Sequence, residues 1–290
     1  PDGKYIAYAV RNDGIETLLV KQIVANSVMQ LVSPAEVMYF GATFSNDSSY
    51  IYYTVYEKNS SNLYEIPVLG GSPRKLVNNV GGKITFSPDG KTMAFIRSRN
   101  SLILANAKSG GEEKLLATAS EGELWRYVVW NPNGKSIVIA ANKSSNEYLI
   151  EVVVDSGMAK RLDANDWTAI TGISWLSDGN GLVLSGVNAE TKIPQLWFLY
   201  YPAGKLRHIT NDFSFYVKAD LTADNNTLIS VKQEKLFNIW FSADGTQKSL
   251  KKITVEEGKD EGLSGLAQTP DGKTVYTVRI DDTINIWIVN

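Results

Sequence analysis

The sequence predicts an all-β protein built from repeated four-stranded units, and three observations carry this prediction. A turn phrase of the Pro-Asp-Gly-Lys type recurs, short β-branched and aromatic runs flank each copy, and no window shows a sustained helical stripe. The Asp or Asn of the turn recurs every 42 to 47 residues, at Asp2, Asp47, Asp89, Asn133, Asp178, Asp224 and Asp271. Repeats of about 40–50 residues with four strands each are typical of β-propeller blades.

The turn itself is best read in the stretch Phe86-Ser87-Pro88-Asp89-Gly90-Lys91. Pro presets φ, Asp can accept a hydrogen bond from the backbone two residues on, and Gly takes the positive-φ position. Three copies depart from this phrase, at Asn46–Ser49, Asn131–Gly134 and Ala223–Asn226. Because Asn and Asp tolerate the left-handed conformation, we expect these turns to form as well.

Four short strands follow one another in each unit. The first precedes the turn, as in Ile84–Phe86, and the second follows it, as in Tyr50–Tyr53. The third carries aromatic or aliphatic pairs, as in Leu63–Ile66, and the fourth is short and alternates polar residues, as in Pro73–Leu76. Trp197, Trp240 and Trp287 occupy the same place in successive third strands, which favours a role in the core between blades.

The predicted organisation is a single β-propeller domain over residues 1–290, seven-bladed with incomplete first and last blades; six blades are the alternative. The chain begins inside a turn and stops after a third strand, which predicts a fragment of a longer protein. The expected repeat units are approximately 1–41, 42–82, 83–126, 127–171, 172–217, 218–263 and 264–290.

Composition limits the possible functions. The chain is 43% hydrophobic and 21% charged, which is sufficient for a packed core. A net charge of −2 argues against a nucleic-acid surface, which needs a basic face. No apolar run approaches the roughly 18–20 residues of a membrane span, so no membrane insertion is expected. The absence of cysteine excludes disulfides, thiolate metal sites and cysteine nucleophiles.

Residues typical of catalysis are sparse. His208 is the one histidine, and it is best interpreted as structural. No Gly-x-Ser-x-Gly elbow occurs, and the recurrent Asp residues are explained by their turns rather than by a metal site. The paired glycines lack a following helix and do not form a phosphate cradle. The sequence therefore predicts no catalytic residues, no bound metal and no cofactor.

The strongest candidates for binding are aromatic residues in the segments that lead into the first strands. In a propeller these segments share one face, and large aromatic rings with arginine are typical of binding hot spots. The alternative is that the rings wedge between adjacent blades. The candidate ligand- or partner-binding residues are Tyr39, Phe40, Trp125, Arg126, Asp166, Trp167, Phe215 and Tyr216.

The Phe-Ser-Pro-Asp-Gly-Lys phrase, followed by an apolar second strand and a Leu-Tyr or Ile-Trp third strand, resembles the repeat of TolB-like propellers. The second half carries Trp167–Trp175, Gln195–Trp197, Arg207–Asp212 and Asn238–Trp240. This succession is similar to the repeat region that follows bacterial eukaryotic-type serine/threonine kinase domains or winged-helix regulator domains. The resemblance implies a sensory or interaction domain, often outside the cytoplasmic membrane.

Three functions remain open from the sequence. The first is a non-enzymatic sensor or scaffold of a bacterial signalling protein, which binds a protein, peptide or small ligand around the central channel. The second is a non-catalytic propeller that filters substrates for a larger hydrolase or peptidase. The third, a catalytic propeller such as a glycosidase or lactonase, needs convergent carboxylates or a channel metal, and near the inner strands only Asp220 offers a carboxylate.

Overall fold

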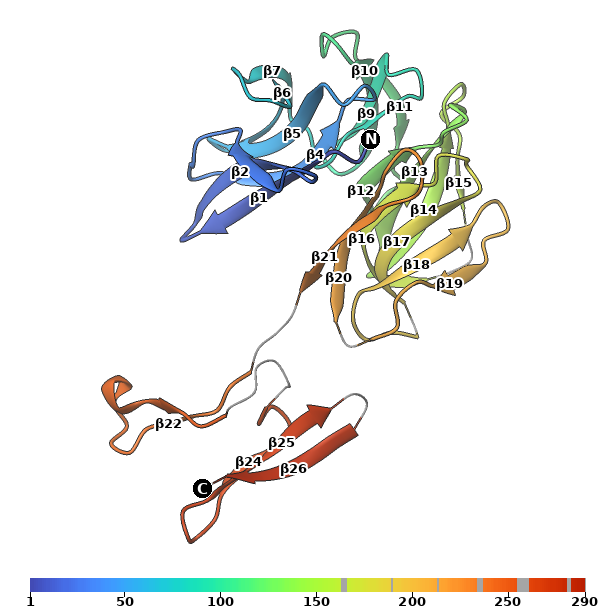
Figure 1. Cartoon of the computed structure of the whole chain (residues 1–290). Helices are drawn as coiled ribbons and strands as arrows, with labels where there is room; N and C mark the ends of the chain where they lie inside the picture. Colours follow the sequence, from blue (N-terminus) through green and yellow to red (C-terminus); the bar gives the residue numbers. More distant parts are fainter. Residues whose placement is uncertain are drawn as a thin grey trace. The chain divides into compact units, whose positions relative to one another are not determined.

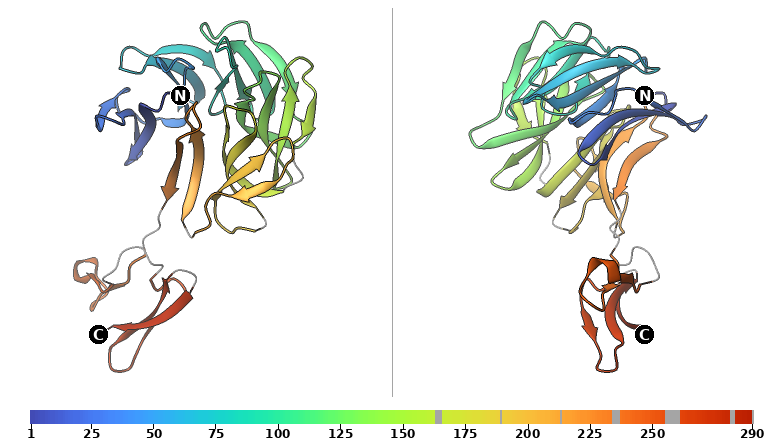
Figure 2. Two further views of the ribbon diagram at one scale, coloured as in Figure 1. Left: turned by 45° about the vertical axis from the view of Figure 1, so that its right-hand side comes forward. Right: turned by 90° about the vertical axis from the view of Figure 1, so that its left-hand side faces the viewer.

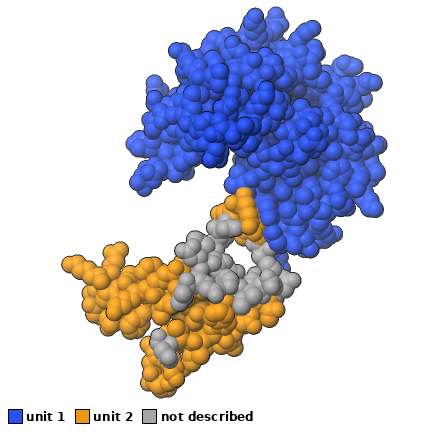
Figure 3. Space-filling view, viewed as in Figure 1, with its two compact units in different colours: residues 1–212, 216–231 blue, residues 213–215, 232–290 orange. Residues whose placement is uncertain are grey.

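A computed structural model describes residues 1–162, 166–188, 190–212, 214–233, 237–254, 261–280 and 283–289. The chain forms two compact units, coloured separately in Figure 3. Unit 1 comprises residues 1–212 and 216–231, and unit 2 comprises residues 213–215 and 232–290. The strands are antiparallel throughout the described part of the chain, and no α-helix occurs there.

The strands β1 to β19 of unit 1 form five successive groups along the chain (Figures 1 and 2), here called blades 1 to 5. Blade 1 consists of β1 (Tyr5–Asn12), β2 (Ile15–Gln22) and β3 (Ser27–Gln30). Blade 2 consists of β4 (Met38–Phe44), β5 (Tyr50–Glu57), β6 (Ser60–Pro67) and β7 (Arg74–Asn78). Blade 3 consists of β8 (Thr85–Phe86), β9 (Thr92–Arg97), β10 (Ser101–Asn106) and β11 (Lys114–Thr118).

Blades 4 and 5 are joined into one larger sheet by a single pairing between Glu147 and Trp167. Blade 4 consists of β12 (Glu123–Trp130), β13 (Ser136–Lys143), β14 (Asn146–Val153) and β15 (Ala159–Arg161). Blade 5 consists of β16 (Trp167–Trp175), β17 (Gly181–Asn188), β18 (Gln195–Tyr200) and β19 (Leu206–His208). The hairpin of β20 (Phe215–Leu221) and β21 (Leu228–Gln233) follows and lies largely in unit 1.

Unit 2 holds the remaining elements. A short ladder pairs β22 with β23, and a three-stranded sheet has the order β24-β25-β26. Their bounds are β22 (Trp240–Phe241), the 3₁₀ helix η1 (Gln247–Ser249), β23 (Lys251–Lys252), β24 (Leu266–Gln268), β25 (Thr274–Ile280) and β26 (Thr283–Val289). The all-β fold of antiparallel four-stranded blades is confirmed. The number of blades stays a prediction, because the seventh repeat lies in unit 2.

The turns have the predicted chemistry. In six of the seven, the Asp or Asn side chain accepts the backbone N–H two residues on, as Asp89 does from Lys91 at 3.1 Å. Ser48 and Asn225 take the position of the usual glycine, each with φ of 60°, so the departing turns form as expected. A hydroxyl at the start of several turns also donates to the carboxylate and lowers the pKa of that Asp, as Ser87 does for Asp89 at 2.6 Å.

Consecutive blades are tied together by hydrogen bonds that span one repeat. Thr43 donates to the carbonyl of Ile84 at 2.9 Å, and the backbone N–H of Trp130 donates to the hydroxyl of Thr85 at 3.0 Å. The turns bond in the same way, since Asn46 donates to the carbonyl oxygens of the next turn at 3.1 Å. A fixed repeat length therefore places equivalent atoms of neighbouring blades within hydrogen-bond distance.

The inner strands approach one another closely where glycine occurs. A Cβ on Gly41 would lie 2.6 Å from the backbone of Lys83, and one on Gly172 would lie 2.7 Å from the backbone nitrogen of Ala219. The sixth turn lies beside the first, because the N–H of Ala223 donates to the carbonyl of Pro1 at 2.9 Å.

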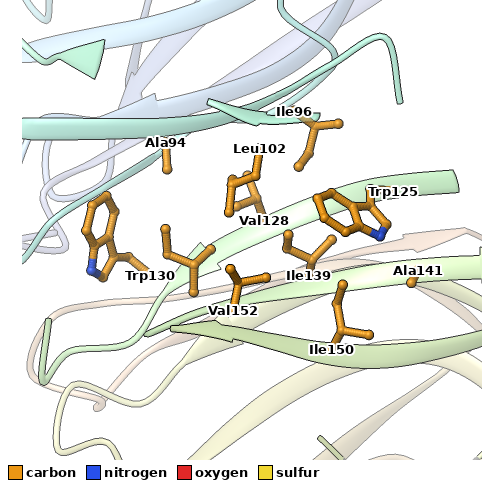
Figure 4. Packing of buried hydrophobic residues seen from close by; sticks show 11 residues of the cluster. Ala94, Ile96, Leu102, Trp125, Val128, Trp130, Ile139, Ala141, Ile150 and Val152 are labelled. Atoms are coloured by element: carbon orange, nitrogen blue, oxygen red, sulfur yellow. The ribbon is translucent and has the colours of Figure 1, made fainter. Parts of the chain in front are cut away.

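The hydrophobic core lies between blades rather than at one centre. In Figure 4 apolar residues of blade 3, such as Ala94 and Leu102, face Trp125 and Val128 of blade 4. Equivalent clusters form at the other junctions of unit 1, and Trp197 is buried in one of them, as the repeat predicts.

The same core prediction is wrong for Trp240 and Trp287, which are 55% and 36% exposed. Among the described residues of unit 2, the buried cluster consists of Ile239, Tyr276 and Val278, with Ile253 and Val289 packed against it, and neither tryptophan belongs to it. Among the described residues, no helix has the length and apolar character needed to cross a bilayer.

Candidate functional site

The segments that carry the candidate binding residues lead into the first strands, as the sequence analysis expected. The structure makes them the first parts of β4, β12, β16 and β20, except that Asp166 precedes β16. β4, β12 and β16 contain a register shift near these residues, in β4 between Tyr39 and Gly41. A bulge lets a strand continue past the point where regular pairing ends, so it lengthens the inner strand at the expense of the loop.

Strand geometry separates the candidates into two sets, because successive side chains point to opposite faces. Trp125 and Trp167 are each 1% exposed and pack in two different clusters, Trp125 as drawn in Figure 4. Trp167 meets the ring of Trp197 edge-on at 5.7 Å. Neither indole N–H has a hydrogen-bond partner among the described residues. Both tryptophans thus occupy the wedge between blades that the sequence analysis kept as the alternative.

Tyr39 belongs to the same inward-facing set. Its ring packs on Tyr53 with 5.7 Å between ring centroids, and its backbone N–H donates to the carboxylate of Glu16 at 2.7 Å. Burial, followed by the nearby charge of Glu16, raises the pKa of Tyr39 to about 12, so its phenol stays neutral. The equivalent bond in blade 5 runs from the N–H of Ile170 to Glu147 at 2.6 Å, again 23 residues apart.

Phe40 belongs to the outward-facing set. It is 40% exposed and lies 6.1 Å from the ring of Tyr56, which is 43% exposed. Met38 pairs with Tyr56 across the two strands and is exposed as well. We call Met38, Phe40 and Tyr56 the loop-end patch, because they lie where β4 begins and β5 ends.

The charged candidates are held in ion pairs. Arg126 pairs with the buried carboxylate of Glu147, and its guanidinium lies 6.0 Å from the ring of Tyr127. Asp166 is exposed and pairs with Arg161 at 2.7 Å. Arg126 therefore neutralises, within blade 4, the carboxylate that also accepts from Ile170 of blade 5.

The last two candidates lie at the start of β20. The hydroxyl of Tyr216 donates to Asp212 at 2.9 Å, and its backbone N–H donates to the carbonyl of Pro194. Phe215 is half-buried and is assigned to unit 2, whereas the other candidates belong to unit 1.

Asp220, the one carboxylate noted near the inner strands, meets side chains that the sequence analysis missed, and these come from blades that are not consecutive. Lys83, next to β8, pairs with Asp220 of β20 at 2.7 Å, and Ser174 reaches the same carboxylate at 3.4 Å. Lys218 of β20 lies 5.0 Å from the ring of Tyr127. We call Lys83, Tyr127, Lys218 and Asp220 the central cluster. Lys83, Tyr127 and Lys218 stand six residues before their turn Asp or Asn, at the position that Gly41 and Gly172 occupy in two other repeats, and this shared position was the signal in the sequence.

His208 lies within 3.7 Å of Trp197, measured between ring centroids, and 3.2 Å from Glu190. This packing agrees with a structural role. No three His, Cys, Asp or Glu side chains converge as a metal site among the described residues. The side chains that the site presents are the exposed apolar residues of the loop-end patch and the lysines of the central cluster.

No family model matches the chain, and no curated protein matches its sequence. Solved structures do match. TolB from Acinetobacter baumannii aligns with a TM-score of 0.54 and 13% identity, over 99% of this chain and 77% of TolB. A chain of a nidogen/laminin complex aligns with a TM-score of 0.62 and 13% identity, over 79% of this chain and 84% of that chain. An oligogalacturonate lyase in complex with manganese aligns with a TM-score of 0.55 and 15% identity, over 97% of this chain and 73% of the lyase chain.

These neighbours include β-propellers, and the likeness is to the TolB-like propeller fold. At 13–15% identity they show the fold alone.

Proposed function

We propose that this chain is a non-enzymatic sensor or scaffold propeller of a bacterial signalling protein, and that it binds a protein or peptide partner at the loop-end patch. One observation carries the proposal: two aromatic rings and a methionine stay exposed together where β4 begins and β5 ends. Clustered aromatic and methionine side chains are enriched in protein interfaces. One neighbour was solved as a nidogen/laminin complex, which agrees with a role in protein binding.

The sequence resemblance supports the signalling setting and a kinase or winged-helix companion domain. The lyase neighbour makes an enzymatic propeller the natural competitor, since it was solved with manganese. The described residues bring no three metal-ligating side chains together and pair the one histidine with Glu190, which supports a binding role over a lytic one.

The test is a peptide library displayed on phage and selected against the 290-residue chain. We expect the selected peptides to bind Phe40→Ser/Tyr56→Ser at least tenfold more weakly than the wild type. Leu69→Ser is the control, because Leu69 is also apolar and, at 69%, even more exposed, but it follows β6 at the opposite end of blade 2. Peptides that bind all three proteins equally contradict the proposal.

A second pair of variants separates the binding role from substrate filtering for a larger hydrolase. Lys83→Ala and Lys218→Ala remove charges of the central cluster and leave the loop-end patch intact. We expect peptide affinity to change less than twofold. A loss confined to these two variants favours a ligand that enters the centre, as a filtered substrate does.

A further inference from the structure

A cleft of about 390 Å³ opens between blades 2 and 3, next to their turns and away from the loop-end patch. Its walls include Tyr50, Tyr52, Glu65 and Arg74 of blade 2, and Ala107 and Lys108 of blade 3. The two turns that border it are held together by Asn46, which donates to the carbonyl oxygens of Ser87 and Pro88 at 3.1 Å.

The origin of the cleft becomes clear when equivalent residues of the blades are compared. In five blades the same backbone hydrogen bond recurs. The residue just after β2, β6, β10, β14 or β18 donates its N–H to the carbonyl of the residue that follows the turn glycine, or that follows the residue in place of this glycine. These donors are Ile23, Val68, Ala107, Val154 and Tyr201. The residue three positions before each donor lies within that same strand and is paired with a residue of the preceding strand. These are Val20, Glu65, Leu104, Glu151 and Phe198.

At each junction, the third-strand residue of one blade faces the donor residue of the next. Val20 and Val68 share one apolar cluster, and Leu104 and Val154 pack against another. At the junction of blades 4 and 5, the hydroxyl of Tyr201 donates to Glu151 at 2.9 Å. These three junctions are therefore filled by side chains of matching character.

The junction of blades 2 and 3 is the mismatch. Glu65 occupies the place of Glu151, and Ala107 occupies the place of Tyr201. The methyl group of Ala107 therefore faces Glu65, whereas the phenol of Tyr201 faces Glu151 at the junction of blades 4 and 5. The cleft at Ala107 is the space that a tyrosine side chain would fill.

Glu65 retains capacity for another donor. Its Oε1 atom lies 2.7 Å from Nε and 2.6 Å from Nη2 of Arg74, and Tyr52 also hydrogen bonds to its carboxylate. Glu151 accepts from Tyr201, Lys160 and Ser136 together. Because an ionised carboxylate offers about four acceptor sites, Glu65 can accept from one further donor.

The geometry points to a binding site for a phenol, namely that of a tyrosine side chain, whose hydroxyl donates to Glu65. Tyr50 and Tyr52 supply aromatic walls for the ring. Lys108 stands at the rim, where it meets the peptide part of the ligand. This site is independent of the loop-end patch, so each can fail without the other.

The probe is N-acetyl-L-tyrosinamide, titrated into the ¹⁵N-labelled chain and followed by NMR, with N-acetyl-L-phenylalaninamide as the comparison. We expect shifts centred on Gly90, Ala107 and Lys108, and at least tenfold weaker binding of the phenylalanine compound, which lacks the hydroxyl. Equal affinity for both compounds, or shifts that avoid these residues, would overturn the assignment.

Two cleft variants test the site itself. Ala107→Tyr places the phenol in cis and Ala107→Leu fills the space without a hydroxyl; both are expected to weaken binding at least tenfold. Ala203→Tyr, in the exposed turn after β18, is the matched control and keeps wild-type affinity. Wild-type binding by both folded cleft variants contradicts the proposal.

A gain of binding completes the design. Tyr201→Ala removes the phenol from the junction of blades 4 and 5, so it should create a second site beside Glu151. We expect the stoichiometry to rise from one tyrosinamide to two. If Tyr201→Ala unfolds, Tyr201→Val, which copies Val154, is the second variant: it should fold and retain one site. Phe40→Ser/Tyr56→Ser should bind tyrosinamide like the wild type, which separates this site from the proposed function.

Discussion

Blades 2 and 4 carry the same cross-strand pair of opposite charges, yet their junctions with the next blade differ. Glu65 opposes Arg74 in blade 2, and Glu151 opposes Lys160 in blade 4. Tyr201 of blade 5 covers Glu151, whereas blade 3 offers Ala107 to Glu65. The Glu151 side chain is 5% exposed and the Glu65 side chain 12%. One residue of the following blade thus decides whether a junction is closed or remains open to a ligand.

The largest effect is expected from opening the closed junction. Tyr201→Ala removes a ring that packs edge-on against Trp175 at 5.1 Å and a hydrogen bond to Glu151. We expect the free energy of unfolding to fall by about 3 kcal/mol, measured by urea denaturation. Tyr200→Ala, at the exposed neighbouring residue, should cost less than about 1 kcal/mol. Equal losses in the two variants would break the comparison.

The next effect is expected from closing the open junction. Ala107→Tyr should raise the free energy of unfolding by about 1 kcal/mol, because a phenol fills the cleft and reaches Glu65. Thermal unfolding of the variant and the wild type gives the measurement. A lowered melting temperature would show that the two junctions differ in backbone geometry as well as in one side chain.

The contribution of the Tyr201 hydroxyl to the free energy of unfolding can be measured separately at alkaline pH. Burial, together with the hydrogen bond to Glu151, raises the pKa of Tyr201 above its value in the unfolded chain. Its contribution is therefore complete below about pH 10 and is lost as the pH rises toward the folded pKa. Tyr201→Phe should cost about 1 kcal/mol at pH 8. The difference from the wild type should shrink by pH 11, and a constant difference would contradict the assigned hydrogen bond.

The smallest effects concern the basic partners. Arg74→Met and Lys160→Met each remove a cation that is more than half exposed. Each should cost about 0.5 kcal/mol in urea denaturation, and 1 M NaCl should reduce the cost because surface ion pairs are screened. The arginine variant should lose somewhat more, since Arg74 also donates to the carbonyl of Lys108 at 2.6 Å.

The repeats, the turns and the all-β class could be read from the sequence because they depend on local chemistry. Asp89 and Gly90 determine their turn within a few residues, and the fixed period then places equivalent atoms together. The accessibility of Trp125 could not be read in this way. The register of β12 shifts between Trp125 and Val128, and the alternation of side chains along the strand then turns Trp125 into the core.

The cleft was also beyond the sequence analysis, and the reason is the varying length of the hairpins. Ala107 follows its turn residue Gly90 by 17 positions, whereas Tyr201 follows Gly179 by 22. An alignment on the turns therefore does not superpose these two residues. Their equivalence is visible only from the shared backbone hydrogen bonds to Lys91 and Asn180.

The bond between Pro1 and Ala223 has a consequence for the order of folding. The other ties between neighbouring turns span about one repeat, as the bond from Asn46 to Ser87 does, so each closes a short segment of chain. The Pro1–Ala223 bond closes a loop of more than two hundred residues, and the entropic cost of closure grows with the logarithm of loop length. We therefore expect the blades to assemble stepwise between neighbours, as repeat arrays do, and this contact to form last.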